Sequence, residues 1–171
     1  MAVSSSSEHE QYMRLALVQA AEAARNGEFP VGCVLVYENR VVATGARRNS
    51  VNNPNEIDHA EIVALRALIH RGDDCDFSRV ALYSTMEPCL MCFSTLILSG
   101  VRTIVYGYED AMGGGTGLKL SDLPPLYADM DVSIIPHILR DECLTLFKEF
   151  FSANDNVYWK DSLLARYTLQ Q

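Results

Sequence analysis

His59-Ala60-Glu61 and Pro88-Cys89-Leu90-Met91-Cys92 are the two stretches that fix both the architecture and the chemistry expected of this chain. Each stretch stands where the residue pattern predicts the first turn of a helix. His59 offers an imidazole nitrogen, and the two-residue spacing lets the thiolates of Cys89 and Cys92 reach one ion. The positive end of a helix dipole also favours thiolate over thiol. One imidazole and two thiolates form a good ligand set for Zn²⁺.

Three protein ligands leave the fourth tetrahedral position of a zinc ion open, which is typical of a catalytic site. Zinc lowers the pKa of a water molecule at that position towards about 7. Glu61 lies two residues after His59 and can reach this water without binding the metal. We expect Glu61 to take the proton of the water and to pass it to a ring nitrogen and then to a leaving amine. The motif therefore predicts hydrolytic loss of ammonia from an amino-substituted ring carbon.

Three other interpretations of these motifs exist. A C-x-x-C pair also occurs in redox sites, but that interpretation leaves the H-x-E stretch and the proline before Cys89 unexplained. The structural alternative is a capped helix plus an unrelated pair of cysteines. An alternative of another class is an inactive zinc-binding partner subunit. Loss of the glutamate would mark such a subunit, and Glu61 is present.

Hydrophobic periodicity extends outward from the two motifs and predicts alternating strands and helices. Asp58 is the expected cap of the helix that begins at His59. The alternation indicates an α/β architecture with helices on both faces of a sheet. We expect strands at residues 31–37, 40–45, 80–85, 101–108 and 132–135. We expect helices at residues 8–26, 59–70, 88–99 and 138–151, with a glycine-rich loop at 109–125.

The length of 171 residues fits one compact domain. Residues 1–7 are expected to be a flexible tail, and residues 153–171 a helical C-terminal tail. No apolar run approaches the roughly 20 residues that span a bilayer, so we expect no membrane segment. The five cysteines form no regular framework, which favours a reducing, cytoplasmic location over a secreted disulfide scaffold.

The formal net charge of −8 argues against a large nucleic-acid footprint, because extended phosphate backbones favour basic surfaces. Arg47 and Arg48 are the only adjacent basic pair, and they leave room for a small local patch. The acidic balance therefore favours a small substrate, such as a free base or a nucleoside.

The H-x-E and P-C-x-x-C stretches are identified as the signature of the cytidine-deaminase superfamily. The chain resembles in particular the TadA-like tRNA adenosine deaminase and nucleoside deaminase branch. The shared stretches are FPVGCVLV at 29–36, HAEIVALR at 59–66, TMEPCLMC at 85–92 and YGYEDA at 106–111. This resemblance implies a three-layer α/β/α fold with a central five-stranded mixed sheet, a zinc-dependent deaminase and a homodimer.

The same resemblance implies roles for several other residues. Asn49 matches an asparagine that hydrogen-bonds the target base or its sugar. Val31 and the backbone of Ala60 would line the base pocket, and Asp110 matches a position near bound nucleic acid. Glu87 belongs to the metal-site loop and is not expected to transfer protons. Adenosine at the wobble position of a tRNA anticodon is the implied substrate. The alternative is free guanine, cytosine, adenosine or cytidine.

The C-terminal tail departs from the resemblance, because it lacks the basic character of the bacterial tRNA enzymes. Trp159, Leu163 and Tyr167 recur every four residues, which predicts a common helical face. The structural interpretation is a helix packed on its own domain. The functional hypothesis is that Tyr158 and Trp159 cap the pocket of the same subunit or of a partner and stack on a base.

Overall fold

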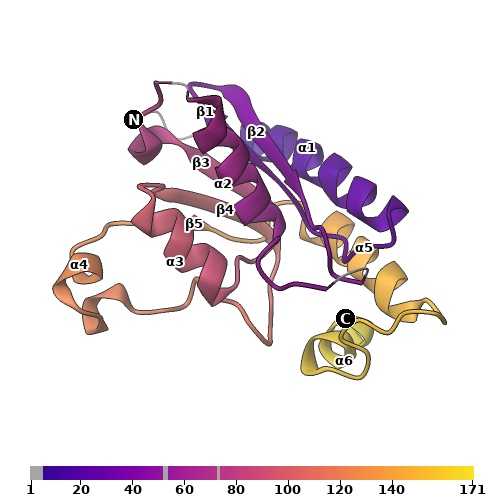
Figure 1. The fold of residues 1–171 in the computed structure, drawn as a ribbon. Coiled ribbons are helices and arrows are strands. Elements are labelled where there is room, and N and C mark those ends of the chain that lie inside the picture. Colours follow the sequence, from indigo (N-terminus) through magenta and orange to yellow (C-terminus); the bar gives the residue numbers. More distant parts are fainter. Residues whose placement is uncertain (1–5, 52–53, 73) are drawn as a thin grey trace.

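A five-stranded mixed sheet forms the centre of the chain in the computed structural model, which describes residues 6–51, 54–72 and 74–171 (Figure 1). The strand order is β2-β1-β3-β4-β5. Strand β1 is antiparallel to both β2 and β3, whereas β3, β4 and β5 run parallel. The strands are β1 Gly32–Tyr37, β2 Arg40–Ala46, β3 Ala81–Met86, β4 Thr103–Tyr108 and β5 Ser133–Ile135.

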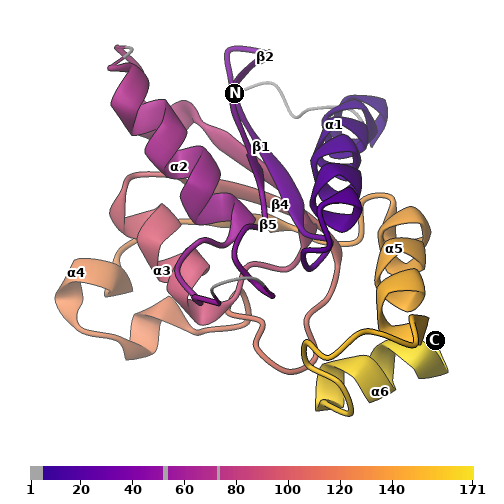
Figure 2. The ribbon, with the colours of Figure 1, turned by 45° about the vertical axis from the view of Figure 1, so that its right-hand side comes forward.

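Helices cover both faces of this sheet, which confirms the three-layer α/β/α prediction. Figure 2 shows α1 and α5 on one side of the sheet and α2 and α3 on the other. The helices are α1 Ser6–Arg25, α2 Ala60–Arg71, α3 Leu90–Leu98, α4 Pro125–Ala128, α5 Arg140–Ser152 and α6 Leu163–Gln170. Two 3-10 turns lie at Phe77–Arg79 and Leu120–Asp122. No described helix combines the length and the apolar character needed to span a bilayer.

The central strands are buried on both faces, as their continuous apolar runs predict. Val34 and Leu35 on β1, Leu82 on β3 and Ile104 on β4 are completely buried. The two residues between the strands predicted at 31–37 and 40–45 form a tight turn between β1 and β2, and Glu38 and Asn39 have φ values of 48° and 60°. A two-residue turn in which both residues have positive φ has a backbone twist that matches the right-handed twist of the flanking strands.

Close packing of β2 against α2 fixes the start of the helix that carries the first motif. A Cβ atom on Gly45 would lie 2.0 Å from the carbonyl oxygen of Ala60. Only glycine therefore lets the strand approach this helix so closely. The contact determines where His59 and Glu61 stand relative to the sheet.

Two local predictions, for the start of the chain and for the cap of α2, differ from the structure. Of the predicted flexible tail, residues 1–5 lie outside the described residues, while Ser6 and Ser7 already belong to α1. The cap of α2 is His59 and not Asp58. The carboxylate of Asp58 instead accepts hydrogen bonds from the side chains of Asn49 and Asn55, at 2.8 and 2.9 Å. These two amides hold Asp58 away from the helix start.

The C-terminal tail is helical only over α6, and residues 153–162 are not helical. The prediction that Trp159 shares a helical face with Leu163 and Tyr167 is wrong, because Trp159 precedes the helix and has a φ of 53°. Helix α6 packs against α5. The hydroxyl group of Tyr108 donates a hydrogen bond of 3.1 Å to the completely buried Thr168, which anchors α6 to the end of β4.

Candidate active site

Two helix starts place the predicted metal-binding side chains side by side. His59 is the N-cap residue of α2, and Cys89 is the N-cap residue of α3. Neither side chain caps its own helix. The Nδ1 atom of His59 instead lies 3.5 Å from Sγ of Cys89 and 3.5 Å from Sγ of Cys92. The structure thus brings the H-x-E and P-C-x-x-C stretches together.

The geometry of this cluster fits a zinc ion. The three ligand atoms all lie within 4.8 Å of one another. A tetrahedral ion with Zn–N and Zn–S bonds of about 2.0 and 2.3 Å holds its nitrogen and sulfur ligands about 3.5 Å apart. The two N···S distances of 3.5 Å agree with this value. Little rearrangement would be needed for His59, Cys89 and Cys92 to bind one ion.

The two cysteines have different acidities. The hydrogen bond from the Cys92 thiol lowers the pKa of Cys89 to about 4; burial opposes this effect and the His59 imidazole adds to it. The same hydrogen bond, together with burial, raises the pKa of Cys92. The pair therefore contains a thiolate at neutral pH, which is the form that binds metal.

Glu61 lies beside this cluster in the first turn of α2 and is only 3% exposed. One carboxylate oxygen accepts a hydrogen bond of 3.3 Å from the hydroxyl group of Ser84, and the other lies 3.6 Å from Sγ of Cys92. Burial raises the pKa of Glu61. A carboxyl group whose pKa is shifted towards neutrality is well suited to take up a proton and release it again.

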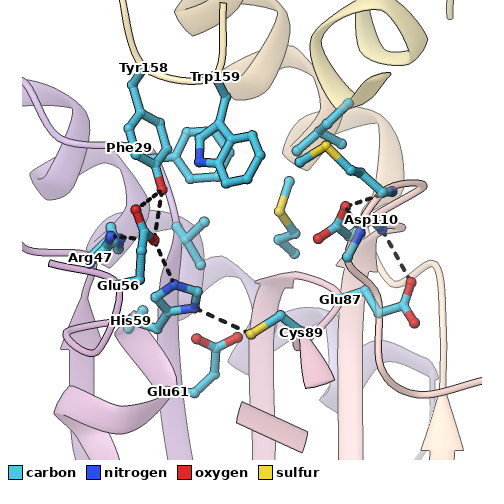
Figure 3. A pocket seen from close by; sticks show the side chains of 16 residues that line it. Phe29, Arg47, Glu56, His59, Glu61, Glu87, Cys89, Asp110, Tyr158 and Trp159 are labelled. Carbon is cyan, nitrogen blue, oxygen red and sulfur yellow. Dashed lines mark hydrogen bonds and ion pairs between the residues drawn. The ribbon is translucent and has the colours of Figure 1, made fainter. Parts of the chain in front are cut away.

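A cavity of about 220 Å³ gives access to these side chains (Figure 3). His59, Glu61 and Cys89 line one side of the cavity. Tyr158 and Trp159 point towards them from the opposite side, and they come from the tail of the same chain. The cluster and the aromatic tail therefore face each other across one cavity.

Most of the residues predicted to contact substrate line this cavity. They are Val31, Ala60, Asp110, Tyr158 and Trp159. Asn49 is not among the lining residues. Its side-chain amide donates a hydrogen bond to Asp58, and its φ of 55° is left-handed. The position of Asn49 thus shapes the loop before His59, and a direct contact with substrate stays a prediction.

The glycine-rich loop is fixed against the metal-site loop by Glu87. The carboxylate of Glu87 accepts hydrogen bonds from the backbone N–H of Asp110, at 3.2 Å, and from the N–H and hydroxyl of Thr116, at 3.2 and 2.5 Å. A Cβ on Gly114 would lie 2.5 Å from the carboxyl carbon of Glu87. Gly114 also forms an isolated β-bridge with Cys89. This loop therefore holds Asp110 at the edge of the cavity, where burial raises the pKa of Asp110.

Several lining residues were not predicted from the sequence. They include Phe29, Arg47, Glu56, Met112 and Leu164. Phe29 stands in a stretch shared with the deaminases, and Glu56 lies three residues before His59, so both carried a weak signal. The sequence indicates Arg47 as part of a small basic surface patch, but its side chain is only 2% exposed and donates hydrogen bonds within the protein.

Comparisons with known proteins agree with this geometry. The tRNA-specific adenosine deaminase 2 of Danio rerio is 36% identical over 157 residues, which are 86% of this chain and 72% of that protein. The tRNA-specific adenosine deaminase of Buchnera aphidicola subsp. Schizaphis graminum is 33% identical, and the match covers 82% of this chain and 91% of that protein. A solved structure from a study of A-to-I editing by tRNA:A34 deaminases has a TM-score of 0.68 and 28% identity. The match covers 80% of this chain and 98% of that one.

The family-level match spans the part of the chain that carries both motifs. Residues 6–108 match the family described as the cytidine and deoxycytidylate deaminase zinc-binding region. This range contains α1, the first four strands, α2 and α3, and therefore the whole cluster around Glu61. The chain is a deaminase that belongs to the cytidine and deoxycytidylate deaminase zinc-binding family.

Proposed function

We propose that this deaminase converts adenosine to inosine at the wobble position of a tRNA anticodon, with zinc held by His59, Cys89 and Cys92. The observation that carries the chemistry is the buried carboxylate of Glu61 beside this cluster, at the side of an accessible cavity. The substrate assignment is supported by relatives that are named tRNA-specific adenosine deaminases.

Glu61 moves the protons in the proposed reaction. Zinc, when bound, supplies Lewis acidity that lowers the pKa of water at its open position to about 7. Glu61 takes one proton from the attacking water and delivers it to the neighbouring ring nitrogen while the C–O bond forms. It then takes the second proton to the amino group, and the C–N bond breaks as the C=O bond forms. One water is consumed and one ammonia is released.

The cavity walls supply the proposed contacts with the base. Val31 and Ala60 are among the residues that line the cavity, and Trp159 faces the cluster from the tail. We assign the stacking contact to Trp159 and Tyr158 because a base has a flat π-face that aromatic side chains bind. Asp110 is assigned to the edge of the base. Asn49 is assigned to the base or its sugar through Oδ1, since its Nδ2 is bonded to Asp58.

The second candidate is a small free base or nucleoside, namely guanine, cytosine, adenosine or cytidine. The observation that favours it is charge: the net charge is −8, and the guanidinium of Arg47 is buried in internal hydrogen bonds. The two candidates differ in their response to ionic strength. Binding of tRNA weakens steeply as salt rises because phosphate contacts release counterions, whereas binding of a neutral base is nearly independent of salt.

The assembly and the location of the enzyme are also proposals. We infer a homodimer, supported by the exposed side chains of Leu90 and Leu98 on the apolar helix α3, next to the metal cluster. A cytoplasmic location is supported by the free thiols of Cys33, Cys89, Cys92 and Cys143, which suit a reducing compartment. An inactive zinc-binding subunit is disfavoured because Glu61 is present, and its carboxylate lies 3.6 Å from Sγ of Cys92.

A substrate panel tests this proposal. Zinc-loaded protein is incubated with a tRNA anticodon stem-loop carrying adenosine at the wobble position, and separately with adenosine, cytidine, guanine and cytosine. Ammonia release is measured at low and high salt. We expect ammonia only from the stem-loop, with a KM that rises steeply with salt. Release from a free base with a salt-independent KM would instead establish the second candidate.

A further inference from the structure

Glu56 connects three elements around the cavity. One of its carboxylate oxygens lies 3.4 Å from Nε2 of His59 and 3.1 Å from Nη2 of Arg47. The hydroxyl group of Tyr158 donates to the same oxygen at 3.2 Å (Figure 3). A metal-site histidine, a buried arginine and the C-terminal tail thus share one acceptor.

The contact with His59 is on the side of the ring away from the cysteines. The Nδ1 atom of His59 faces both sulfur atoms, so Nε2 carries the proton when Nδ1 binds metal. A carboxylate that accepts this proton fixes the tautomer and the orientation of the ring and makes Nδ1 a better ligand. Glu56 stands in this position relative to His59.

Arg47 holds the carboxylate of Glu56 in place through a hydrogen-bonded ion pair. The Arg47 side chain is 2% exposed, and its guanidinium also donates to the carbonyl oxygens of Arg48, at 2.5 Å, and Asn55, at 2.9 Å. These bonds tie the loop before α2 to the end of β2. The Glu56 side chain is itself 58% exposed, so its place depends on these partners and not on packing.

Tyr158 connects Glu56 to the C-terminal tail through direct contacts. Its ring packs against Phe29 at a centroid distance of 5.3 Å and against Trp159, edge to face, at 5.9 Å. Trp159 has a left-handed φ of 53°, which non-glycine residues adopt at an energetic cost. The surrounding contacts therefore have to hold the tail in this conformation, and the Tyr158–Glu56 hydrogen bonds are among them.

We propose that Glu56 is a positioning residue that couples the metal site to the C-terminal tail, so that metal bound at His59 and the closed tail stabilise each other. The proposal rests on the zinc site of the proposed function. Binding of metal orders the His59 ring, the ring orders Glu56, and Glu56 holds the Tyr158 hydroxyl over the cavity. Linkage requires the reverse effect as well, so the closed tail strengthens metal binding.

Trp159 makes this coupling measurable without any activity assay, because it is the only tryptophan of the chain. Its fluorescence and its quenching by acrylamide report directly on the tail. We compare wild type with Glu56→Gln, which keeps the size of the side chain and removes its charge, and with Tyr158→Phe, which removes only the link to the tail. Glu38→Gln is the matched control, since Glu38 is an exposed carboxylate that pairs with Arg79 away from the cavity.

Zinc affinity is measured by competition with a chelator, and acrylamide quenching of Trp159 is measured with and without zinc. Wild type and Glu38→Gln should bind zinc with equal affinity, and zinc should reduce their quenching. Glu56→Gln should bind zinc about 10-fold more weakly or worse and lose the quenching response. Tyr158→Phe should also lose the response, while its zinc affinity should fall by only about 2- to 5-fold, as expected for a modest coupling.

The coupling is refuted if Glu56→Gln binds zinc as tightly as wild type, or if quenching of wild-type Trp159 does not respond to zinc. Circular dichroism of each variant shows that the fold is retained. The two proposals fail in different ways. Wild-type protein that binds no zinc contradicts the proposed function and the coupling together, whereas zinc-dependent deamination with an unchanged Glu56→Gln affinity contradicts the coupling alone.

Discussion

The C-terminal helix is held against the sheet by Glu109, and replacing this residue by glutamine gives a quantitative prediction. Arg140 donates two hydrogen bonds to the carboxylate, at 2.8 and 2.5 Å, and the Tyr167 hydroxyl donates a third at 2.8 Å. Burial raises the pKa of Glu109, but these hydrogen bonds outweigh burial and bring the pKa to about 2. Glu109→Gln keeps the shape of the side chain and removes the charge that Arg140 requires.

The expected loss in the free energy of unfolding follows from the pKa of Glu109. A decrease from 4.5 to about 2 corresponds to about 3 kcal/mol between the charged and neutral forms. The pair is partly exposed, with side-chain exposures of 26% for Arg140 and 20% for Glu109. Screening by solvent and salt reduces the expected effect, so we expect Glu109→Gln to lower the free energy of unfolding at pH 7 by about 1–2 kcal/mol.

The dependence on pH has a definite sign. The pKa of Glu109 is lower in the folded chain than in the unfolded chain, so its stabilising contribution is complete above about pH 5 and is lost as the pH falls towards 2. At pH 3 about two fifths of the contribution should remain. Urea unfolding of the zinc-free proteins at pH 7, 5, 4 and 3 measures the difference between wild type and variant.

Asp141→Asn is the matched control for this series. Asp141 also lies near Arg140, at 3.9 Å, but its side chain is 93% exposed, so its removal should change stability by less than about 0.5 kcal/mol. A difference between wild type and Glu109→Gln that is as large at pH 3 as at pH 7 would refute the reasoning. So would equal stabilities of the two proteins at pH 7.

Two further changes test the cavity and the glycine-rich loop beside it. Trp159→Ala should raise the KM for the nucleic-acid substrate by about 5- to 150-fold, because stacking on an aromatic side chain contributes about 1–3 kcal/mol per base. An unchanged KM in steady-state assays would show that Trp159 does not bind the substrate. Gly114→Ala should destabilise the protein by about 1–3 kcal/mol in thermal unfolding, since the new Cβ would lie 2.5 Å from the carboxyl carbon of Glu87. Gly117→Ala is the control, because a Cβ at Gly117 meets no atom within 4 Å, and it should change stability by less than about 0.5 kcal/mol. Equal effects of the two substitutions would show that the contact between residue 114 and Glu87 does not determine stability.

The strands, the helices and the group of three potential metal ligands could be predicted because each is indicated by a short stretch of sequence. Apolar runs locate the five strands, and the motif spacing places His59, Cys89 and Cys92 at helix starts. The strands predicted at 31–37 and 40–45 likewise leave only Glu38 and Asn39 for the hairpin turn between them. In each case the decisive interactions join residues that are close along the chain or that belong to a short signature.

The remaining features depend on contacts between residues that are distant in sequence. Nothing in the tail indicates that Tyr158 bonds to Glu56, which lies 102 positions earlier. The burial of His9 depends on another partner far along the chain, because its Nδ1 atom lies 3.0 Å from the hydroxyl group of Tyr83. Trp159 fits the helical period of α6 and is excluded from it by a backbone conformation that periodicity does not reveal.

The role of Glu61 is tested most directly by measuring zinc content and product formation together for wild type and Glu61→Gln. Wild-type protein should contain one zinc per chain and form inosine and ammonia in equal amounts from the anticodon stem-loop. Glu61→Gln should retain the zinc, because Glu61 is not among the clustered ligands, while the rate of product formation falls by at least about 100-fold. Deamination by Glu61→Gln at the wild-type rate, or by wild type stripped of zinc, would contradict the assignment of proton transfer to Glu61 at a zinc site.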